Sequence, residues 1–428
     1  MARLKEYNGH YCESEYEYAF IGFLEAEGWK YSSGNNISRV TKRDVLIADD
    51  FKKFIADTNP DLIDDEVTQI YDNVRLVGAE SDFATLHKVY GWMVNGVQFT
   101  PQDGLPRMIP LIDFDNWDKN IFRIVNQFTV EYTNNGQKEN RRLDVLLFVN
   151  GMPLCVVELK NPADANATIY DAWEQINIRY WRDIPHLLHY CPLACISDGV
   201  KTRLGTVRTP YEHFYAWRRV TERDAVSTLP FAETETMIKG VYAPERFLEI
   251  FRDYIYFQDS IYDSDEVEIV CRYPQFFAAR LLKQSIIKSV VEKSGKGGTY
   301  FGATGCGKTY TMAFLARQLS LRCIDIPEIG SPTIILIVDR DELQKQGSKL
   351  FTKSKEFLNL GEVSVVKNRT QLRQEIGARQ SGGFYICTIQ KFCDREDDKI
   401  GLINDRQNII CFSDEAHRTQ LEHSKKIQ

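Results

Sequence analysis

The eight residues from Gly302 to Thr309 constrain this chain more than any other segment, because they follow the pattern G-x-x-x-x-G-K-[ST] without deviation. In such a loop, glycines let backbone N–H groups surround the phosphates of a nucleotide, and the lysine neutralises their charge. We expect Gly298–Phe301 to end a strand before the loop and Tyr310–Ser320 to form a helix after it. The loop therefore predicts an ATP site with Mg²⁺ held by Thr309, and its expected binding residues are Gly302, Thr304, Gly305, Cys306, Gly307, Lys308 and Thr309.

An acidic sequence follows a second apolar stretch near the end of the chain. Asn408–Phe412 predicts a strand, and Asp414-Glu-Ala-His417 comes directly after it. An acid at a strand end can hold Mg²⁺ through water, so we expect Asp414 to bind the ion and Glu415 to polarise the attacking water. Acids are also common at helix starts. The phosphate loop upstream favours the nucleotide interpretation over that alternative.

Together these motifs resemble superfamily-two helicases and translocases. Val338–Gln346 and Thr388–Phe392 resemble two DNA-contacting motifs of that family, and Gln275 resembles its adenine-reading glutamine. The family's switch motif and second motor lobe do not follow, because the sequence ends eleven residues after His417. The resemblance implies ATP binding, but we do not expect efficient hydrolysis or translocation by this chain alone.

A second chemistry is predicted in the middle of the chain, where charged residues interrupt apolar runs. Asp144 lies in one run, Glu158 and Lys160 lie in the next, and the Asn150-Gly151 pair between them is a strong hairpin signal. Carboxylate oxygens suit Mg²⁺, so we expect Asp144 and Glu158 to be its ligands. The Lys160 ammonium is then expected to position a water or to neutralise charge at the phosphate under attack. The arrangement D…E-x-K on a hairpin resembles that of PD-(D/E)xK nucleases.

The register of this hairpin tests the nuclease interpretation. With a plain two-residue turn, Val149 would pair with Met152. Asp144 would then pair with Val157 and face away from Glu158. One bulge or a three-residue connection instead places the two acids opposite each other, with Cβ atoms ~4.5–5.5 Å apart. We therefore predict the longer connection or a bulge. The alternative, that these are surface charges at strand ends, is disfavoured because apolar residues flank them on both faces.

The sequence from near residue 11 to the end resembles the R (motor) subunit of type I restriction enzymes. The resemblance is carried by Asn150–Pro162, Ser197-Asp-Gly199 and Trp217. Gln175 and Tyr180 resemble the family's Gln/Tyr helix motif, but they are five residues apart where the family usually has four. The resemblance implies cleavage of double-stranded DNA, coupled in the full complex to ATP-driven translocation. It implies a methyltransferase (M) subunit and a specificity (S) subunit as partners.

The first predicted helix, Glu13–Glu27, has apolar residues at helical spacing. It also carries three acids near its start, Glu13, Glu15 and Glu17. In the family that the chain resembles, an acid lies near the metal. One of these three is a candidate for that role, and a solvated helix face is the equal alternative.

The order of elements predicts an α/β protein with two domains. Residues 1–223 are expected to form a PD-(D/E)xK nuclease domain, with a mixed sheet flanked by helices. Residues 224–265 are expected to be a connecting helical region, and residues 266–428 a RecA-like lobe with a mainly parallel sheet. Other expected elements are a helix at Asp44–Ala56, a loop at Pro101–Pro110, strands at Arg123–Tyr132, Leu143–Val149 and Pro153–Lys160, and helices at Ile169–Arg182 and Pro244–Phe257.

Composition narrows the class of protein. The chain has 53 Lys and Arg against 60 Asp and Glu, so its net charge of −7 excludes a generally basic surface. The acidic excess lies in residues 1–140, which leaves the middle of the chain able to face phosphates. No apolar run reaches the ~18–20 residues of a membrane span, and the N-terminus lacks an apolar signal core. We therefore expect a cytoplasmic protein with reduced cysteines and no membrane contact.

One cluster of potential metal ligands stands apart from these motifs. It consists of His186, His189, Cys191 and Cys195. Zinc sites usually contain C-x-x-C pairs, which are missing here. A buried strand around Leu188–Ile196 explains the segment without a metal.

Two other functions stay open. The chain can be another nuclease–translocase fusion, such as a type III-like defence enzyme. It can also be a truncated, inactive chain that only binds ATP or DNA.

Overall fold

The computed structural model describes residues 13–78, 80–102, 104–160, 168–226, 232–258, 266–303, 305–338, 350–358, 363–392 and 401–414. The chain divides into two compact units. The N-terminal unit consists of Met1–Ile255 and Glu268–Tyr273, and the C-terminal unit of Tyr256–Val267 and Pro274–Gln428. Two short strands, β9 (Ile255–Phe257) and β10 (Glu268–Val270), lie where the chain passes between the units.

The N-terminal unit is built on a mixed six-stranded sheet with the strand order β1-β4-β5-β6-β7-β8. The pairs β1/β4 and β6/β7 are parallel, and the other neighbours are antiparallel. The strands of this unit are β1 (Lys30–Ser33), β2 (Val97–Phe99), β3 (Arg107–Ile109), β4 (Phe122–Asn134), β5 (Gln137–Val149), β6 (Met152–Leu159), β7 (Leu193–Ser197) and β8 (Thr202–Thr206). Its helices are α1 (Glu13–Ala26), α2 (Ala48–Thr58), α3 (Asp64–Arg75), α4 (Asp82–Asn95), α5 (Ile169–Glu174), η3 (Gln175–Tyr180), α6 (Trp181–Asp183), α7 (Pro185–Leu188), α8 (Ala232–Met237), η5 (Ile238–Tyr242) and α9 (Pro244–Asp253).

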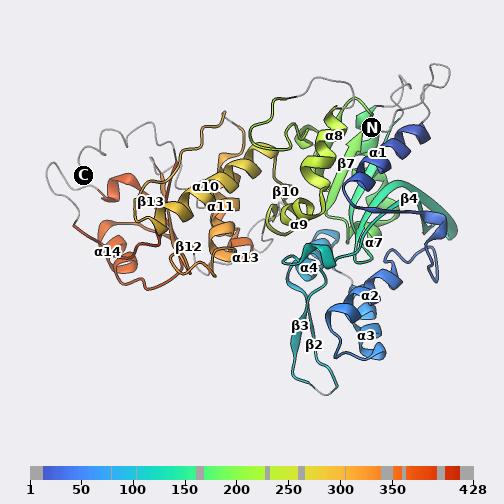
Figure 1. Ribbon diagram of the computed structural model, residues 1–428, viewed down its shortest axis with the longest axis horizontal. Coiled ribbons are helices and arrows are strands. Elements are labelled where there is room, and N and C mark those ends of the chain that lie inside the picture. Colours follow the sequence, from blue (N-terminus) through green and yellow to red (C-terminus); the bar gives the residue numbers. More distant parts are fainter. Residues whose placement is uncertain are drawn as a thin grey trace. The chain divides into compact units, whose positions relative to one another are not determined.

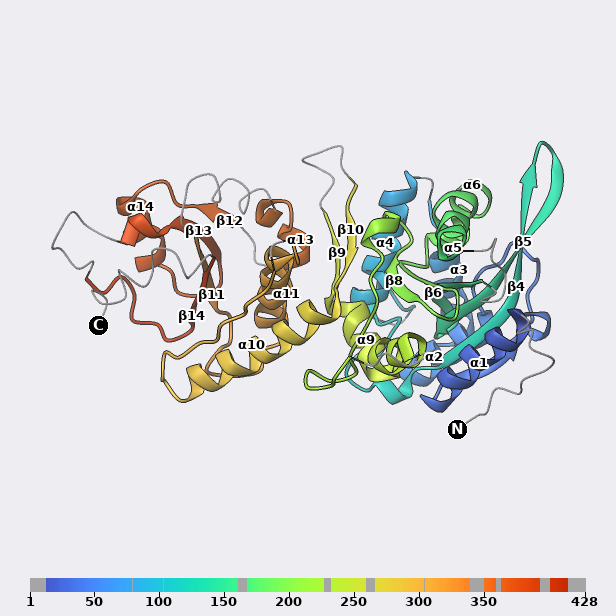
Figure 2. The ribbon, with the colours of Figure 1, turned by 90° about the horizontal axis from the view of Figure 1, so that it is seen from above.

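The centre of this sheet is buried on both faces. Every residue of β6 is buried, and so is the β5 segment 145–149, which explains their nearly unbroken apolar sequences. The other half of β5 is polar and forms, with β4, a hairpin that extends beyond the rest of the sheet (Figure 2). The strands β2 and β3 form a separate small hairpin that projects from the unit (Figure 1).

Helix α1 forms as its sequence predicts. Tyr16, Phe20 and Leu24 lie one turn apart and are buried, so they give the helix one apolar face. Gly28 follows with a φ of 103°, a conformation that glycine adopts without steric cost. Glu17 belongs to the buried face, whereas Glu15 is half-buried.

The C-terminal unit contains a four-stranded sheet with the order β12-β13-β11-β14, in which all neighbours are parallel. Apolar residues of β11, β13 and α14 form one buried cluster against this sheet. The elements of this unit are α10 (Tyr273–Val291), α11 (Lys308–Leu321), β11 (Thr333–Val338), α13 (Lys355–Leu358), β12 (Val363–Val365), α14 (Arg369–Gly377), β13 (Phe384–Thr388), η7 (Ile389–Phe392) and β14 (Ile409–Ser413). The α/β class and the parallel sheet of this unit are therefore as predicted.

Three local predictions were wrong. Gly298–Phe301 ends no strand, because the segment is irregular and the side chain of Phe301 is 95% exposed. Its glycines favour such irregular backbone over a strand. Pro101–Pro110 contains β3, which only its pairing with β2 reveals. The helix predicted at Pro244–Phe257 ends at Asp253, and the aromatic and β-branched residues after it form β9 instead.

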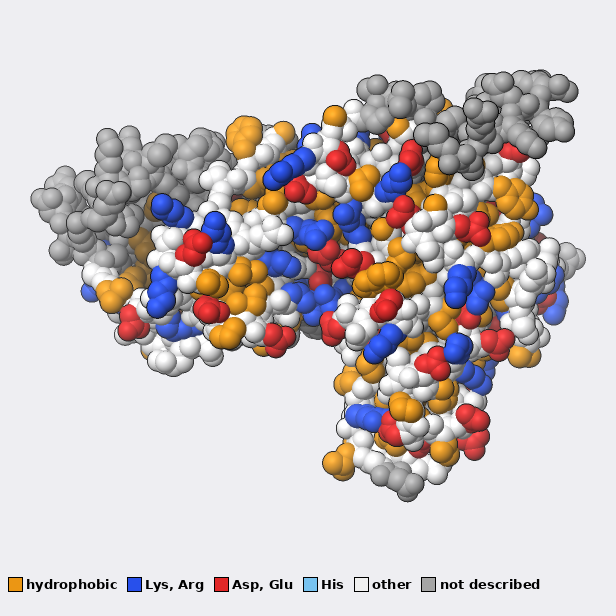
Figure 3. Space-filling view, viewed as in Figure 1, with side chains coloured by type: hydrophobic (Ala, Val, Ile, Leu, Met, Phe, Trp, Pro, Cys, Tyr) orange, Lys and Arg blue, Asp and Glu red, His pale blue; other side chains and the backbone are white. Residues whose placement is uncertain are grey.

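Within the part of the chain that the structure describes, no helix has the length and apolar character needed to cross a bilayer. On the face of the N-terminal unit that Figure 3 shows, acidic and basic side chains are interspersed.

Candidate active site

The turn between β5 and β6 has two residues, Asn150 and Gly151. Their φ values of 50° and 76° are both positive, as in the hairpin turn that Asn-Gly favours. The Asn150 side chain anchors the turn, since its Nδ2 donates to the Leu111 carbonyl and its Oδ1 accepts from the Ile121 N–H. The turn is therefore tied to the chain before β4.

A bulge in β6 offsets this two-residue turn. Leu147 pairs with Cys155, but the next residue, Phe148, pairs with Pro153, so β6 contains one extra residue at this point. Pro153 lacks an N–H and suits such an irregular position. Beyond the bulge, Val145 pairs with Val157. The predicted bulge is therefore confirmed.

The bulge brings the two predicted carboxylates together. The register that pairs Val145 with Val157 places Asp144 opposite Glu158. Asp144 Oδ2 accepts from the Leu159 N–H at 2.9 Å. Glu158 has no exposed surface, and its burial, reinforced by the charge of Asp144, raises the pKa of its carboxyl well above the usual value. Two ionised acids side by side in a buried strand pair are an unfavourable arrangement, which a shared proton or a bound cation relieves.

Glu158 is held by two side chains from the segment after β6. Tyr180 Oη donates to Glu158 Oε1 at 2.5 Å, and Gln175 Nε2 donates to Glu158 Oε2 at 2.8 Å. Gln175 Oε1 in turn accepts from Lys160 Nζ at 2.9 Å. Lys160 Nζ lies 4.0 Å from Glu158 Oε2, so acid, amide and ammonium form one connected group. Burial, followed by the Glu158 charge, raises the pKa of Tyr180 well above its ordinary value.

A π-helical turn explains why Gln175 and Tyr180 meet although they are five residues apart. The segment Gln175–Tyr180 is π-helical, with i→i+5 hydrogen bonding. In an α-helix of 3.6 residues per turn, residues five apart would point about 140° away from each other. In this turn, Gln175 Nε2 instead lies 2.7 Å from Tyr180 Oη. The departure from the family's usual spacing of four is therefore absorbed by the backbone.

The donor set at Asp144 and Glu158 fits Mg²⁺. This ion is commonly bound by one or two carboxylates and otherwise by water and phosphate oxygens. Among the residues that the structure describes, no three His, Cys, Asp or Glu side chains converge as a metal cage. The Glu17 carboxylate accepts hydrogen bonds from Asn126 Nδ2 and Gln127 Nε2.

The phosphate loop of the C-terminal unit leads into α11, which begins at Lys308. Gly305 and Gly307 have φ values of 79° and 81°, which a residue with a Cβ rarely adopts. Lys308 Nζ donates to the Gly302 carbonyl at 3.4 Å. The buried Gln275 donates through Nε2 to the Gly307 carbonyl at 3.1 Å, so it lies directly on the loop.

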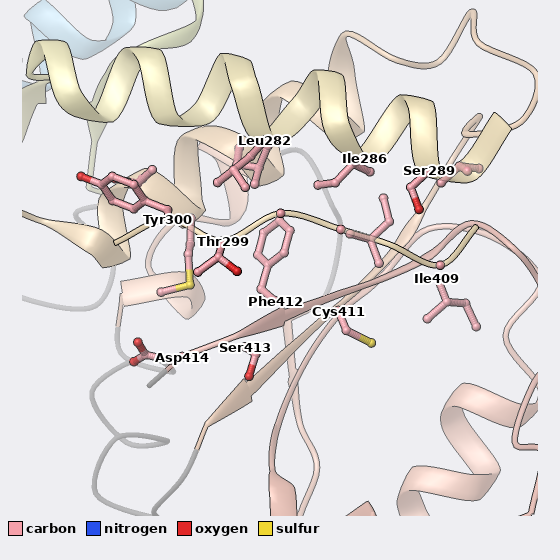
Figure 4. Close-up of a pocket in the computed structure, with 18 of the residues that line it drawn as sticks. Leu282, Ile286, Ser289, Thr299, Tyr300, Ile409, Cys411, Phe412, Ser413 and Asp414 are labelled. Carbon is pink, nitrogen blue, oxygen red and sulfur yellow. The ribbon is translucent and has the colours of Figure 1, made fainter. Parts of the chain in front are cut away.

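A pocket of about 800 Å³ lies beside this loop. Its lining includes Lys308, Met312 of α11, Leu282 of α10 and Phe412 of β14. Asp414 lies at the end of β14 and also lines the pocket (Figure 4). The structure thus brings the loop lysine and the predicted magnesium-binding acid to one pocket.

Several predicted site residues fall outside the described part of the chain. They are Thr304, Glu415, His417 and residues 339–346 of the first DNA-contacting motif. The second such motif, Thr388–Phe392, comprises the last residue of β13 and η7.

In the cluster of His186, His189, Cys191 and Cys195, both cysteines are buried and His189 contacts an acidic side chain. His189 Nε2 lies 2.9 Å from Asp82 Oδ1, and burial lowers the pKa of His186 to about 4. Burial also raises the pKa of the Cys191 thiol well above its usual value. The expected strand begins only at Leu193, because Pro192 precedes it.

Two family models match the chain. Residues 11–213 match the model described as the type I restriction enzyme R protein N terminus, and residues 274–427 match the SWI2/SNF2 ATPase model. The type I restriction enzyme HindI endonuclease subunit of Haemophilus influenzae is 30% identical over 97% of this chain and 40% of its own length. The putative type I restriction enzyme MjaIXP endonuclease subunit of Methanocaldococcus jannaschii is 29% identical over 94% of this chain and 39% of its own length. The chain thus spans about 40% of the length of these relatives.

Proposed function

We propose that this chain, which belongs to the family of type I restriction enzyme R subunits, is a Mg²⁺-dependent nuclease for double-stranded DNA. One observation carries the proposal. The β6 bulge sets Asp144 opposite the buried Glu158, and Lys160 lies 4.0 Å from the second of these carboxylates. We propose that residues 1–223 have the PD-(D/E)xK nuclease fold and that residues 266–428 form a RecA-like ATPase lobe. Residues 224–265 are the proposed connecting helical region between these two domains.

Each side chain of the nuclease site has a defined role in this proposal. Asp144 and Glu158 would hold Mg²⁺, and the bound ion would supply an activated water and stabilise charge on the phosphate under attack. Gln175 accepts from Lys160 Nζ and so fixes the position of the ammonium near the attacked phosphate. Tyr180 donates to Glu158 and keeps one carboxylate oxygen oriented while the other faces Gln175.

The C-terminal unit has the proposed role of binding ATP and Mg²⁺. Lys308 and the left-handed glycines of the loop supply cationic and N–H contacts for phosphates. Thr309 and Asp414 are the proposed contacts of the ion, Glu415 the group that polarises water, and Gln275 the adenine-reading residue.

The function of a longer protein of this family is also a proposal for this chain. We propose that it works in the cytoplasm with a methyltransferase subunit and a specificity subunit, which select the DNA site. ATP-driven translocation in that complex would precede cleavage. The names of the relatives, which are endonuclease subunits of type I restriction enzymes, support this assignment.

The test is Mg²⁺-dependent nicking of supercoiled plasmid by the purified 428-residue chain. The variants Asp144→Ala and Lys160→Ala are expected to lose nicking activity. The control variant Lys138→Ala, at an exposed position of β5, is expected to keep it. Binding of the M subunit, measured by pull-down, tests the partner. If wild type, Asp144→Ala and Lys160→Ala nick equally, the proposed nuclease function is wrong.

A further inference from the structure

Strand β4 departs from regular strand geometry at Gln127. This residue has a φ of 51°, and it is the one non-glycine residue with a positive φ inside a strand among those the structure describes. The other three, Asn135, Asn150 and Lys293, lie outside the strands. A non-glycine residue in such a conformation costs on the order of 1–3 kcal/mol and persists only where its surroundings hold it.

Three side chains hold this kink, and we call Glu17, Asn126 and Gln127 the amide clamp. Asn126 Nδ2 donates to Glu17 Oε1, and Gln127 Nε2 donates to Glu17 Oε2, each at 2.6 Å. In a regular strand, consecutive side chains point to opposite faces. The positive φ at Gln127 breaks that alternation and lets two neighbouring amides reach one carboxylate of α1. The kink and the hydrogen bonds therefore depend on each other.

The orientation of the clamp is fixed further by β1. Tyr31 Oη donates to Asn126 Oδ1 at 3.0 Å, which leaves Nδ2 of the same amide facing Glu17. On the backbone side, a Cβ added at Gly34 would lie 2.6 Å from the Asn126 carbonyl oxygen and 2.8 Å from that of Gln127. The kink is thus packed against backbone on one side and bonded to Glu17 through its side chains.

The clamp lies next to the proposed nuclease site along the sheet. Asn126 pairs with Val145 and Phe128 pairs with Leu143. The position between these two pairs is Gln127 on β4 and Asp144 on β5, and the ladder is interrupted there. The row across three strands therefore runs from the kink through Asp144 to Glu158.

We infer that the amide clamp is a positioning device for the proposed cleavage reaction, in which Glu17 fixes the kink of β4 and the kink sets the place of the Asp144 carboxylate. The inference rests on the proposed nuclease function. It assigns Glu17 a role through Asn126 and Gln127, not as a ligand that shares a cation with Asp144 and Glu158. Catalytic geometry is sensitive to such support, because a misplacement of about 1 Å can cost on the order of 10²-fold in rate.

Two perturbations separate positioning from metal binding. Glu17→Gln removes the carboxylate to which both amides of β4 donate and leaves one acceptor oxygen in its place, whereas the exchanged pair Glu17→Gln with Gln127→Glu restores a carboxylate bonded to an amide. Gly34→Ala changes no polar group and presses only on the kinked backbone. Glu25→Gln, at an exposed position on the same helix, is the matched control.

The measurements are plasmid nicking as a function of Mg²⁺ concentration and amide hydrogen exchange of β4 in EDTA. Glu17→Gln and Gly34→Ala are expected to lower the maximal nicking rate at least about tenfold while the Mg²⁺ concentration for half-maximal rate stays within about twofold. Both should speed hydrogen exchange in 122–134 without metal. The exchanged pair should recover nicking to within about threefold of wild type, and Glu25→Gln should match wild type in both measurements.

Three outcomes would overturn the inference. The first is a Glu17→Gln variant that needs at least tenfold more Mg²⁺ at an unchanged maximal rate, as expected for a lost ligand. The second is an exchanged pair that stays as inactive as Glu17→Gln. The third is a Gly34→Ala variant with wild-type exchange and nicking. Failure of the proposed function is distinguishable from all three, because Asp144→Ala would then nick like wild type.

Discussion

The hydroxyl of Tyr180 offers a quantitative test of the site, because it bonds to the buried carboxylate of Glu158. Tyr180→Phe leaves Glu158 Oε1 without its 2.5 Å donor and removes the 2.7 Å contact to Gln175. A buried acceptor that loses its partner costs about 1–3 kcal/mol. A unit of this size shifts its Tm by roughly 2–4 °C per kcal/mol, so we expect a fall of about 2–12 °C at neutral pH.

The size of this loss should depend on pH. The pKa of Glu158 is raised in the folded chain, so its contribution to stability is fully present below the ordinary value of 4.5 and is lost as pH rises through the folded pKa. The Tyr180 hydrogen bond lowers that pKa, and its removal raises it further. As the pH is raised from about 4.5, the free energies of unfolding of wild type and Tyr180→Phe should therefore first fall in parallel and then diverge where the pH passes the folded pKa of Glu158 in the wild type.

The assay is thermal unfolding followed by circular dichroism in EDTA over this pH range, together with Mg²⁺-dependent nicking. Tyr190→Phe is the matched control, because Tyr190 is equally buried and donates at 2.7 Å to the neutral carbonyl of Val74. Its loss of stability should be the same at every pH, and its nicking should be unchanged. If Tyr180→Phe and Tyr190→Phe lower the Tm by the same amount at each pH, the coupling between Tyr180 and Glu158 is refuted.

Three further predictions concern the turn, the π-helical segment and the nucleotide loop. Gly151→Ala should lower the free energy of unfolding in urea by at least about 2 kcal/mol, because Gly151 has a φ of 76° and an added Cβ would meet neighbouring backbone. A loss of under about 0.5 kcal/mol would contradict the turn geometry. Deletion of the exposed Ile178 would reduce the spacing of Gln175 and Tyr180 from five residues to four. An ordinary α-helix then turns both side chains to one face, so we expect nicking to be preserved. A deletion variant that folds but does not nick DNA would refute this. Lys308→Ala should weaken binding of a fluorescent ATP analogue about 10- to 150-fold in a titration, as expected for a lost charged contact, and an unchanged Kd would refute its role.

The hairpin shows what local sequence can predict. The Asn-Gly turn and the apolar runs follow from residue preference, and the bulge follows from the chemical demand that Asp144 and Glu158 share a face. The position of the bulge did not follow, because it depends on how Pro153 and its neighbours pack. For Gln175 and Tyr180, the spacing alone suggested a poor fit, since the π-helical turn that reconciles them carries no simple sequence signature.

Contacts between distant segments were beyond this kind of prediction. Glu17 stood among three equivalent helix acids, and only the folded chain distinguishes it through Asn126 and Gln127, more than a hundred residues away. The sequence did contain one signal that was missed, the pair Asn126-Gln127. Such polar residues are uncommon inside a strand whose other residues are mainly β-branched and aromatic. In the C-terminal unit, the loop motif correctly predicted helix α11 but not the irregular backbone before it, where glycines outweigh the apolar residues.

The bulge in β6 determines which side chains of the hairpin lie on the same face of the sheet. Inside the paired parts of β5 or β6, a single inserted or deleted residue would exchange the two faces of everything beyond it, unless a second irregularity cancelled the change. A residue inserted in the turn at Asn150-Gly151 would only lengthen the turn and leave the pairing of the strands unchanged. The connection can therefore vary in length at the turn, whereas the strands between Asp144 and Glu158 can change length by one residue only if a bulge is created or removed.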